Sequence, residues 1–291
     1  MKQLSGEMSV VPSRIKSMPN RLFKEFSEFI ESRLGIKMPP SKKTMLESRL
    51  QKRIRQLGLD SYEDYYNHVF NGHDSNDELI LMINMVTTNK TDFFREPAHF
   101  DYLLNNALPV LLEMQKSHCK RLRIWSAGCS TGEEPYTMAM VLSEVSRELA
   151  GFSFSILATD ISTKVLNHGI QGIYSMDKVE PIPLNLKKRY LLRSRDKKKN
   201  LARVVPALRQ KVQFRRLNLM DSDFGIRDPL DVIFCRNVII YFDRPTQEKL
   251  LNNFYRNLIP GGYVFMGHSE TLNGLRVPLV QVAPTIYRRM Q

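Results

Sequence analysis

The stretch RIWSAGCSTGEEPY (residues 123–136) predicts a buried strand, a glycine turn and the first turn of a helix. Gly128 and Gly132 bound the turn, and glycine permits both a tight reversal and the close approach of a ligand. The helix that follows begins with unpaired N–H groups, where a ligand can bind. The spacing matches neither the dinucleotide fingerprint nor a phosphate-binding loop with its lysine. The turn is therefore either a ligand site or a plain strand-to-helix connection.

Apolar runs and helical patterns alternate along the rest of the chain. The runs typical of strands are FSFSILATD (152–160), KVQFRRLNL (211–219) and DVIFCRNVIIYF (231–242). TQEKLLNNFYRNL (246–258) is typical of a helix, which Pro260, Gly261 and Gly262 should end. Such alternation indicates a parallel sheet covered by helices on both faces, and therefore an α/β fold.

The 291 residues suggest about two domains, because the part before the sheet is helical throughout. Leu46, Leu50 and Ile54 recur at helical spacing there, and the first twenty residues lack any sustained period. The expected organisation is a flexible extension (1–20), a helical domain (21–88), a linker with a connecting helix (89–120) and the sheet domain (121–291), which contains an inserted basic subdomain (about 176–211).

Positive charge is concentrated in one segment. Residues 187–216 hold thirteen Lys and Arg against one acid, Asp196, and so carry twelve of the thirteen net positive charges. Such a block attracts an anionic partner, which could be nucleic acid, a membrane surface or an acidic protein. A solvated loop with good solubility is the alternative.

The cysteines and the hydropathy pattern exclude several classes of protein. Cys119, Cys129 and Cys235 are odd in number and widely spaced, which fits neither a disulfide framework nor a CxxC metal site. No HExxH string occurs, so no metal is expected. An 18-residue apolar run and a cleavable signal are also lacking, so we expect a cytoplasmic chain without membrane insertion.

Polar residues follow the predicted strands at their carboxyl ends. Glu133 and Glu134 open the helix after the first strand, and their charge favours a cationic or hydroxyl-rich ligand over a phosphate. Asp160 ends the next strand, where a carboxylate can accept from ribose hydroxyls. Asn218 and Asn237 lie near further strand ends, where an amide can pair with an adenine edge. Taken singly these residues are more often caps or turns; together they describe S-adenosylmethionine.

Six strings, in the same order along the chain, resemble the CheR family of chemotaxis receptor glutamate methyltransferases. They are NKTDFFR (89–95), WSAGCSTGEEPY (125–136), ATDIS (158–162), NL (218–219), CRNVIIYF (235–242) and MGHSETL (266–272). The resemblance implies an N-terminal all-helical domain and a Rossmann-like S-adenosylmethionine-dependent methyltransferase domain with a small inserted β-subdomain. It also implies S-adenosylhomocysteine as the product of the cofactor.

The resemblance assigns roles to individual residues. Arg95 and Tyr241 would lie nearest the transferred methyl group, and Phe93 and Phe94 would only pack. The residues expected to contact the cofactor are Asn89, Thr91, Arg95, Gly128, Glu134, Asp160, Asn218, Leu219, Arg236 and Asn237. Lys90 and Asp92 are expected to face solvent, and His268 to be structural.

The chemistry needs no general base, because a glutamate side chain, with a pKa of about 4.3, is already ionised at neutral pH. Arg95 can hold one oxygen of that carboxylate through its fork of donors, and Tyr241 can donate an orienting hydrogen bond. The resemblance makes the cytoplasmic helical region of methyl-accepting chemotaxis receptors the partner. Lys42, Arg49 and Arg53 would dock it, since they share one flank of a helix that is basic in this family; an ordinary solvated face is the alternative.

The inserted segment departs from part of the family. Members that tether to a receptor C-terminal peptide have a glycine-containing loop there, whereas LLRSRDKKKNLARV (191–204) has no glycine and three consecutive lysines. We therefore expect electrostatic docking on an acidic receptor surface and a monomeric enzyme. A nucleic-acid methyltransferase is disfavoured because the basic block has few aromatic residues for base stacking. A cofactor-binding adaptor without activity remains open.

Overall fold

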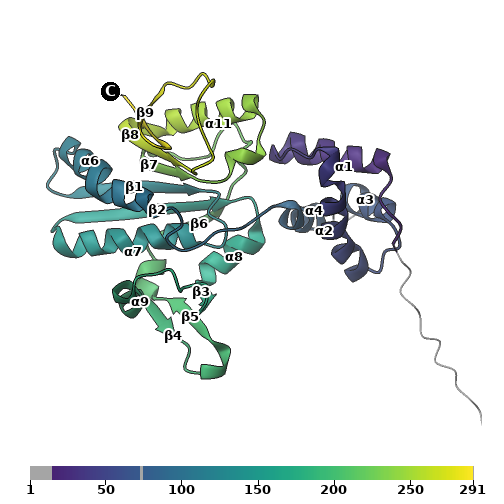
Figure 1. The fold of residues 1–291 in the computed structure, drawn as a ribbon, viewed down its shortest axis with the longest axis horizontal. Helices are drawn as coiled ribbons and strands as arrows, with labels where there is room; N and C mark the ends of the chain where they lie inside the picture. Colours follow the sequence, from purple (N-terminus) through teal and green to yellow (C-terminus); the bar gives the residue numbers. More distant parts are fainter. Residues whose placement is uncertain (1–14, 73–74, 291) are drawn as a thin grey trace, which may run out of the picture. The chain divides into compact units, whose positions relative to one another are not determined.

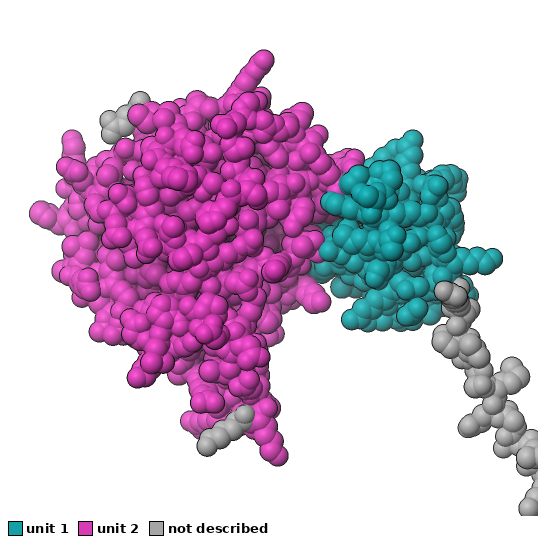
Figure 2. All heavy atoms as spheres, in the orientation of Figure 1, with its two compact units in different colours: residues 1–29, 38–86 teal, residues 30–37, 87–291 magenta. Residues whose placement is uncertain are grey.

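The computed structural model describes residues 15–72 and 75–290, and their contacts divide the chain into two units, 1–29 with 38–86 and 30–37 with 87–291 (Figure 2). Most of the extension expected over residues 1–20 lies outside the described residues. Met18 is buried, and its N–H donates to the Glu47 carboxylate at 2.8 Å. The chain therefore packs into the first unit before its first helix begins.

The first unit is built from helices. They are α1 (Asn20–Leu34, whose last residues belong to the second unit), the short 3-10 helix η1 (Pro40–Lys42), α2 (Lys43–Gln56), α3 (Tyr62–Asn71) and α4 (Ser75–Val86). Leu46, Leu50 and Ile54 of α2 are fully buried, as their spacing predicted. Ser61 caps α3 by accepting the N–H of Asp64 at 3.1 Å. The predicted helical region is confirmed.

The second unit contains a seven-stranded sheet with the order β6-β2-β1-β7-β8-β10-β9 (Figure 1). The strands are β1 (Lys120–Ala127), β2 (Phe152–Asp160), β6 (Val212–Arg216), β7 (Leu230–Cys235), β8 (Leu258–Met266), β9 (Leu279–Ala283) and β10 (Ile286–Arg289). The first five in the sheet order are parallel, as predicted. The last two pair antiparallel and form a hairpin that the sequence did not reveal.

Helices cover both faces of this sheet. Neighbouring residues of β1 enter different cores: Ile124 joins a cluster with α7, whereas Trp125 joins one with Phe254 of α11. The helices and helical turns of this part are α5 (Ala98–Tyr102), η2 (Leu103–Ala107), α6 (Leu108–Met114), α7 (Glu133–Glu148), α8 (Thr163–Gln171), η4 (Ile239–Tyr241) and α11 (Arg244–Asn257). The predicted two-sided burial of the strands is therefore confirmed.

Three predicted boundaries need correction. The run 231–242 is a strand only as far as Cys235, because Asn237 adopts a left-handed φ of 60° and the chain turns away from the sheet. The run 211–219 is a strand only to Arg216. Pro260 and the glycines after it do not lie between the helix and the strand, because β8 already begins at Leu258. The neighbouring strand β7 accommodates them through a shift in its pairing register with β8.

The insertion between α8 and β6 forms a three-stranded antiparallel sheet in the order β3-β5-β4. Its elements are β3 (Ile173–Ser175), α9 (Leu184–Tyr190), β4 (Leu191–Arg193), η3 (Lys197–Lys199), β5 (Leu201–Val204) and α10 (Pro206–Arg209). Tyr174 and Val204 are buried in the same core as α7. The expected inserted β-subdomain is therefore present and shares its core with the main sheet. No helix among the described residues is long and apolar enough to span a membrane.

Candidate functional site at the carboxyl edge of the sheet

The polar residues that follow the parallel strands gather at one edge of the sheet. Gly128 follows β1, Asp160 ends β2, Asn218 comes two residues after β6 and Asn237 two residues after β7. Parallel strands end at the same edge, which in open α/β sheets is where ligands bind. The positions predicted from the strand ends are therefore correct.

The turn after β1 is shaped by Asp160. Its Oδ2 accepts the N–H of Ser130 and its Oδ1 the N–H of Ser162, each at 2.9 Å. Burial raises the pKa of Asp160, while these two hydrogen bonds oppose the rise. Gly128 adopts a φ of 81°, and a Cβ there would lie 2.5 Å from Val238. With hydrogen bonds from the backbone of Ser130, Ser162 and Ile161, the carboxylate keeps one of its about four acceptor positions for a ligand.

The two glutamates that open α7 have different surroundings. Glu134 accepts the hydroxyl of Ser126 at 2.7 Å and lies 3.3 Å from the guanidinium of Arg236. Burial raises its pKa, and Arg236 opposes the rise. Glu133 accepts from Thr131 at 2.6 Å and lies 3.7 Å from the ammonium of Lys178. Glu134 is thus connected to Arg236, and Glu133 to the start of the insertion.

Asn237 combines a strained backbone with an open amide oxygen. Its φ of 60° is uncommon for a residue other than glycine. Within residues 15–72 and 75–290, no hydrogen-bond donor reaches its buried Oδ1. A buried acceptor without a donor is costly, so this oxygen suits a ligand that brings an N–H group. The adenine amino group of S-adenosylmethionine is such a donor, and the residues present therefore fit this cofactor.

Glu270 holds the backbone of the same loop in place and was not identified from the sequence. Its carboxylate accepts the N–H groups of Asn237, Val238 and Ile239 at 2.9 Å each, and that of Gly267 at 2.6 Å. Burial raises its pKa, and these hydrogen bonds oppose the rise. The only feature of the sequence that could have pointed to Glu270 is its position in the MGHSETL string. Because its hydrogen-bond donors are backbone N–H groups, Glu270 fixes the conformation of this loop.

Arg236 connects this edge to the segment before α5. Its side chain is 2% exposed and contacts Glu96 at 3.1 Å and Glu134 at 3.3 Å. It also donates to the carbonyl of Arg95 and lies over the ring of Phe100, 5.5 Å from the centroid. Its donors thus serve the protein itself, so we interpret Arg236 as a residue that positions Glu134. Glu96 was not identified from the sequence.

The NKTDFFR segment is anchored by its aromatic residues. Phe93 is buried and packs edge-on against Tyr174, with the ring centroids 4.9 Å apart. Phe94 has a φ of 54° and donates its N–H to Thr137 at 3.2 Å. The packing predicted for both rings is confirmed. The Asp92 side chain, predicted to face solvent, is 46% exposed and pairs with Lys178 at 2.7 Å.

Arg95 and Asn89 lie on this anchored segment. Arg95 is half-buried and donates to the carbonyl of Lys90 at 3.1 Å. The carbonyl of Asn89 accepts the Ser130 hydroxyl at 2.9 Å, and that of Thr91 accepts from an ammonium group of the insertion. The segment therefore contacts the turn after β1 through its backbone.

The remaining predicted site residues have mixed settings. The amide of Asn218 is engaged at both ends: it donates to the carbonyl of Arg33 at 2.7 Å and accepts from Met220 at 3.1 Å. These contacts make Asn218 a turn residue, so adenine recognition by its side chain is not supported. Leu219 and Tyr241 are half-buried against the second core.

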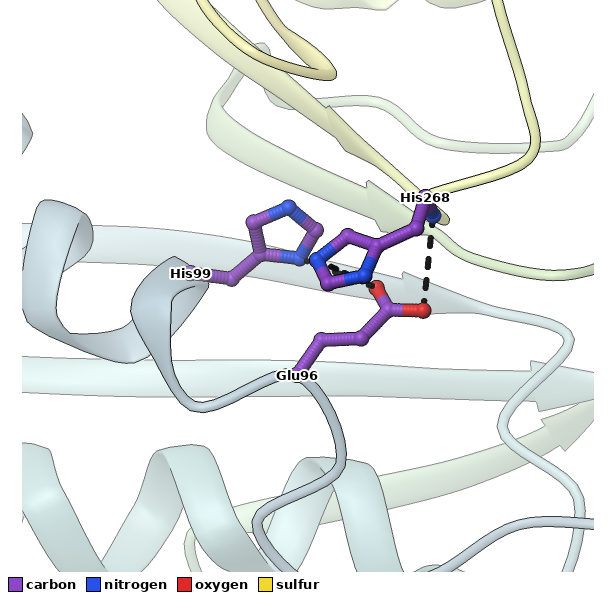
Figure 3. A group of neighbouring side chains, drawn as sticks. All are labelled: Glu96, His99 and His268. Atoms are coloured by element: carbon purple, nitrogen blue, oxygen red, sulfur yellow. Dashed lines mark hydrogen bonds and ion pairs between the residues drawn. The ribbon is translucent and has the colours of Figure 1, made fainter.

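Glu96, His99 and His268 form a cluster that no spacing in the sequence predicted (Figure 3). Their potential ligand atoms all lie within 4.8 Å of one another. Burial and the charge of Arg236 lower the pKa of His99 to about 4. The side chain of His268, which was expected to be structural, is 65% exposed.

Two of the residues predicted to dock the receptor already form contacts inside the first unit. Arg53 forms a two-pronged ion pair with the buried Glu78, with contacts of 2.7–3.1 Å. Arg49 donates to the carbonyl of Val86 at the end of α4. Lys42 ends η1, immediately before α2. Docking by Arg49 and Arg53 would therefore compete with contacts that hold α2 against α4.

Comparisons with known proteins agree over most of the chain. The family model "CheR methyltransferase, SAM binding domain" matches residues 89–287, and "CheR methyltransferase, all-alpha domain" matches residues 21–87. The chain is 41% identical over 264 residues to a chemotaxis protein methyltransferase of Borreliella burgdorferi, covering 90% of this chain and 92% of that one.

Two further relatives give the same result. The chain is 41% identical to chemotaxis protein methyltransferase 2 of Pseudomonas aeruginosa, covering 91% of each chain. It is 36% identical to the chemotaxis protein methyltransferase of Escherichia coli, covering 91% of this chain and 89% of that one. These matches confirm the expected fold class, the S-adenosylmethionine cofactor and the methyltransferase activity.

Proposed function

The chain belongs to the CheR methyltransferase family, and on this premise we propose that it methylates glutamate side chains of chemotaxis receptors. The products would be γ-glutamyl methyl esters and S-adenosylhomocysteine, and the modification would support sensory adaptation. The substrate would be the cytoplasmic helical region of the receptor, so the enzyme would act in the cytoplasm. We propose that it acts as a monomer.

One observation carries the proposal: three acceptors that can still accept a hydrogen bond follow neighbouring parallel strands at the carboxyl edge of the sheet. The Oδ1 of Asn237 lacks a partner among the described residues, and Asp160 and Glu134 are buried carboxylates with accepting capacity left. A ligand for this edge has to bring donors and positive charge. S-adenosylmethionine brings an amino-purine, ribose hydroxyls and a cationic methionine end.

The chain's own residues would divide the cofactor between them. Asn237 accepts from adenine, Asp160 accepts from ribose hydroxyls and Glu134 faces the cationic end. Gly128 allows close approach of the backbone, and Leu219 lines the edge. Arg236 holds Glu134, and Asn89 and Thr91 close the edge through their backbone contacts.

When bound, S-adenosylmethionine supplies a methyl group activated by its sulfonium centre. Arg95 would hold one oxygen of the incoming glutamate carboxylate, so that the other oxygen points at the methyl group. Tyr241 would orient the same carboxylate with its hydroxyl. Alignment of this kind can supply about 7–11 kcal/mol of the barrier in favourable cases, and no group has to remove a proton.

Receptor docking would use basic residues of the helical domain and, separately, of the insertion. We propose Lys42, which ends η1, and Arg49 and Arg53 of α2, where Arg49 first has to leave the carbonyl of Val86 and Arg53 first has to leave Glu78. The insertion adds most of the net charge of the chain, so docking should be electrostatic and weaken with salt. We propose the domain limits 21–88, 89–120 and 121–291, with the insertion at 176–211.

The experiment is transfer of a labelled methyl group from S-adenosylmethionine to receptor-containing membranes. Label should appear on receptor glutamates as an ester that base releases as methanol. Arg95→Ala should keep cofactor affinity within about twofold and lose turnover by two orders of magnitude or more. The exposed Arg227→Ala is the matched control and should change neither quantity.

Different results would contradict different parts of the proposal. Label on RNA, or no label on receptor, would reject receptor methylation, and equal losses of cofactor binding and turnover in Arg95→Ala would make it a cofactor ligand. Salt-insensitive, micromolar binding of an isolated receptor C-terminal peptide would reject electrostatic docking in favour of a tether.

A further inference from the structure

Glu96, His99 and His268 come from three places in the chain and point at one another. Glu96 precedes α5, His99 lies in its first turn, and His268 follows β8 (Figure 3). The Oε2 of Glu96 lies 3.4 Å from Nδ1 of His99 and 4.0 Å from Nε2 of His268. His99 is 2% exposed, whereas the side chain of His268 is 65% exposed. The cluster is therefore buried on one side and open to solvent on the other.

The hydrogen bonds around His99 decide which of its nitrogens carries a proton. Nε2 lies 2.9 Å from the hydroxyl of Thr285, and that hydroxyl donates its own proton to the carbonyl of Pro284 at 2.7 Å. The hydroxyl therefore acts as an acceptor toward His99, and Nε2 has to be the donor. In the neutral ring, Nδ1 then carries no proton and has a free lone pair.

That lone pair faces the carboxylate of Glu96 in a buried site. No hydrogen-bond donor for Nδ1 occurs in the described part of the chain. Two acceptors 3.4 Å apart repel each other unless a proton or a cation lies between them. A histidine that is oriented by a hydrogen bond from its other nitrogen is also the usual arrangement of a metal-binding histidine.

The charge around the cluster has two opposed parts: Arg236 disfavours positive charge at His99, and two carboxylates contact that guanidinium. Arg236 contacts both Glu96 and Glu134, so the three groups together carry one net negative charge. Nε and Nη2 of Arg236 reach Oε2 of Glu96 at 3.3 and 3.1 Å, and the N–H of His268 reaches Oε1 at 3.4 Å, so three of the about four acceptor positions of this carboxylate are in use. One position, on Oε1, is left for a second positive partner.

We propose that Glu96, His99 and His268 bind a divalent transition-metal ion of the Zn²⁺ class. Two imidazole nitrogens and one carboxylate oxygen are a common three-ligand set for Zn²⁺, with the fourth position left to water. The exposed ring of His268 can rotate to shorten its distance to the other two ligand atoms. Thr285 orients His99 from outside the ligand set.

Such an ion would tie the segment before α5 to the loop after β8. Phe94 and Glu96 both have a φ of 54° in this segment, a conformation that surrounding contacts have to hold. The ion would be a second positive partner of Glu96 beside Arg236, which itself contacts Glu134. The site therefore lies next to the cofactor edge but shares no ligand with it.

Metal binding can be measured without any methylation assay. Tag-free full-length chain carrying Cys119→Ser, which removes the one exposed cysteine, is freed of metal with a chelator and titrated with Zn²⁺ by calorimetry. One ion should bind per chain. Bound Co²⁺ should give the visible absorption of a site with nitrogen ligands and low coordination number.

Variants assign the site. His268→Ala and Thr285→Ala should each weaken Zn²⁺ binding by about tenfold or more, the first by loss of a ligand and the second by loss of its orientation. His118→Ala, at another exposed histidine, should leave the affinity unchanged. Circular dichroism checks that each variant is folded, and His268 is exposed enough for its loss to be tolerated.

Three outcomes would overturn the metal site. These are failure to bind one equivalent of Zn²⁺, unchanged affinity in both His268→Ala and Thr285→Ala, and loss of binding in His118→Ala. None of them bears on methyl transfer, so the metal site and the proposed function can fail independently.

Discussion

The buried carboxylate of Glu270 accepts the backbone N–H of Asn237 at 2.9 Å, and so fixes the loop that carries an amide oxygen with no donor among residues 15–72 and 75–290. Glu270→Gln replaces an acceptor oxygen by an NH₂ group that faces backbone donors. We expect a loss of about 1–3 kcal/mol in the free energy of unfolding and about tenfold weaker S-adenosylmethionine binding. Urea unfolding and calorimetry measure the two effects.

The exposed Glu113→Gln is the control for Glu270→Gln and should match the unsubstituted chain in both measurements. A Glu270→Gln variant that loses stability but keeps cofactor affinity would show that the loop geometry does not matter for binding.

Asn237→Gly should separate the amide from the backbone strain. Glycine accepts the φ of 60°, so the loop should keep its shape while the open acceptor is lost. We expect cofactor affinity to fall about 5- to 30-fold, as for one hydrogen bond of about 1–2 kcal/mol, with little change in stability. Asn200→Gly is the matched control, since Asn200 is also left-handed, at φ 45°, but exposed in the insertion. Equal affinities of the two variants would refute adenine recognition by the amide.

Arg236→Gln should be strongly destabilising, because it leaves Glu96 and Glu134 buried without their shared cation. Breaking a buried pair in this way costs about 3–5 kcal/mol. Chemical denaturation should show this loss, whereas the exposed Arg227→Gln should stay within about 0.5 kcal/mol. If Arg236→Gln were as stable as its control, the two carboxylates would need another partner.

Arg53→Gln tests whether α2 docks or only packs. Glu78 is 4% exposed at its side chain and would keep the Tyr65 hydroxyl but lose its cationic partner, so the helical domain should unfold more easily by about 3 kcal/mol. The exposed Lys52→Gln, one residue earlier on α2, should change stability by less than about 0.5 kcal/mol. A stable Arg53→Gln variant with impaired receptor methylation would restore the docking role.

Asp243 makes stability depend on pH. It caps α11 by accepting the N–H of Thr246 at 2.9 Å, and hydrogen bonds from Thr246 lower its pKa below the ordinary 3.8. A lowered pKa means that the cap is fully effective above about 3.8 and is lost as the pH falls through the folded-state pKa. Asp243→Ala should therefore cost about 1 kcal/mol at pH 7, and this difference should shrink below pH 3.8. Asp243→Asn, which keeps an acceptor, should show little pH dependence; a constant difference for Asp243→Ala would contradict the cap.

The strands and helices that the sequence predicted correctly are those with strong apolar periods. The predicted strand FSFSILATD begins and ends at the same residues as β2. The predicted helix TQEKLLNNFYRNL differs from α11 by only a few residues at its ends. The hairpin of β9 and β10 was missed because its strands have only four or five residues, and most of β9 is exposed. Pro260 was predicted to lie between the helix and the next strand, but it lies within β8. The parallel neighbour β7 tolerates it there through a register shift.

By itself, the sequence determined the α/β alternation, the inserted subdomain and the carboxyl-edge positions of Asp160 and Asn237, because periodicity and strand ends are local properties. Only the tertiary structure decided which polar atoms remain without partners. Asn218, which resembled Asn237 in the sequence, is satisfied by Arg33, a residue 185 positions away. Glu96 and His268 meet across 172 positions of sequence. Hydrogen bonding and charge pairing depend on distances in space, and no spacing along the chain encodes them.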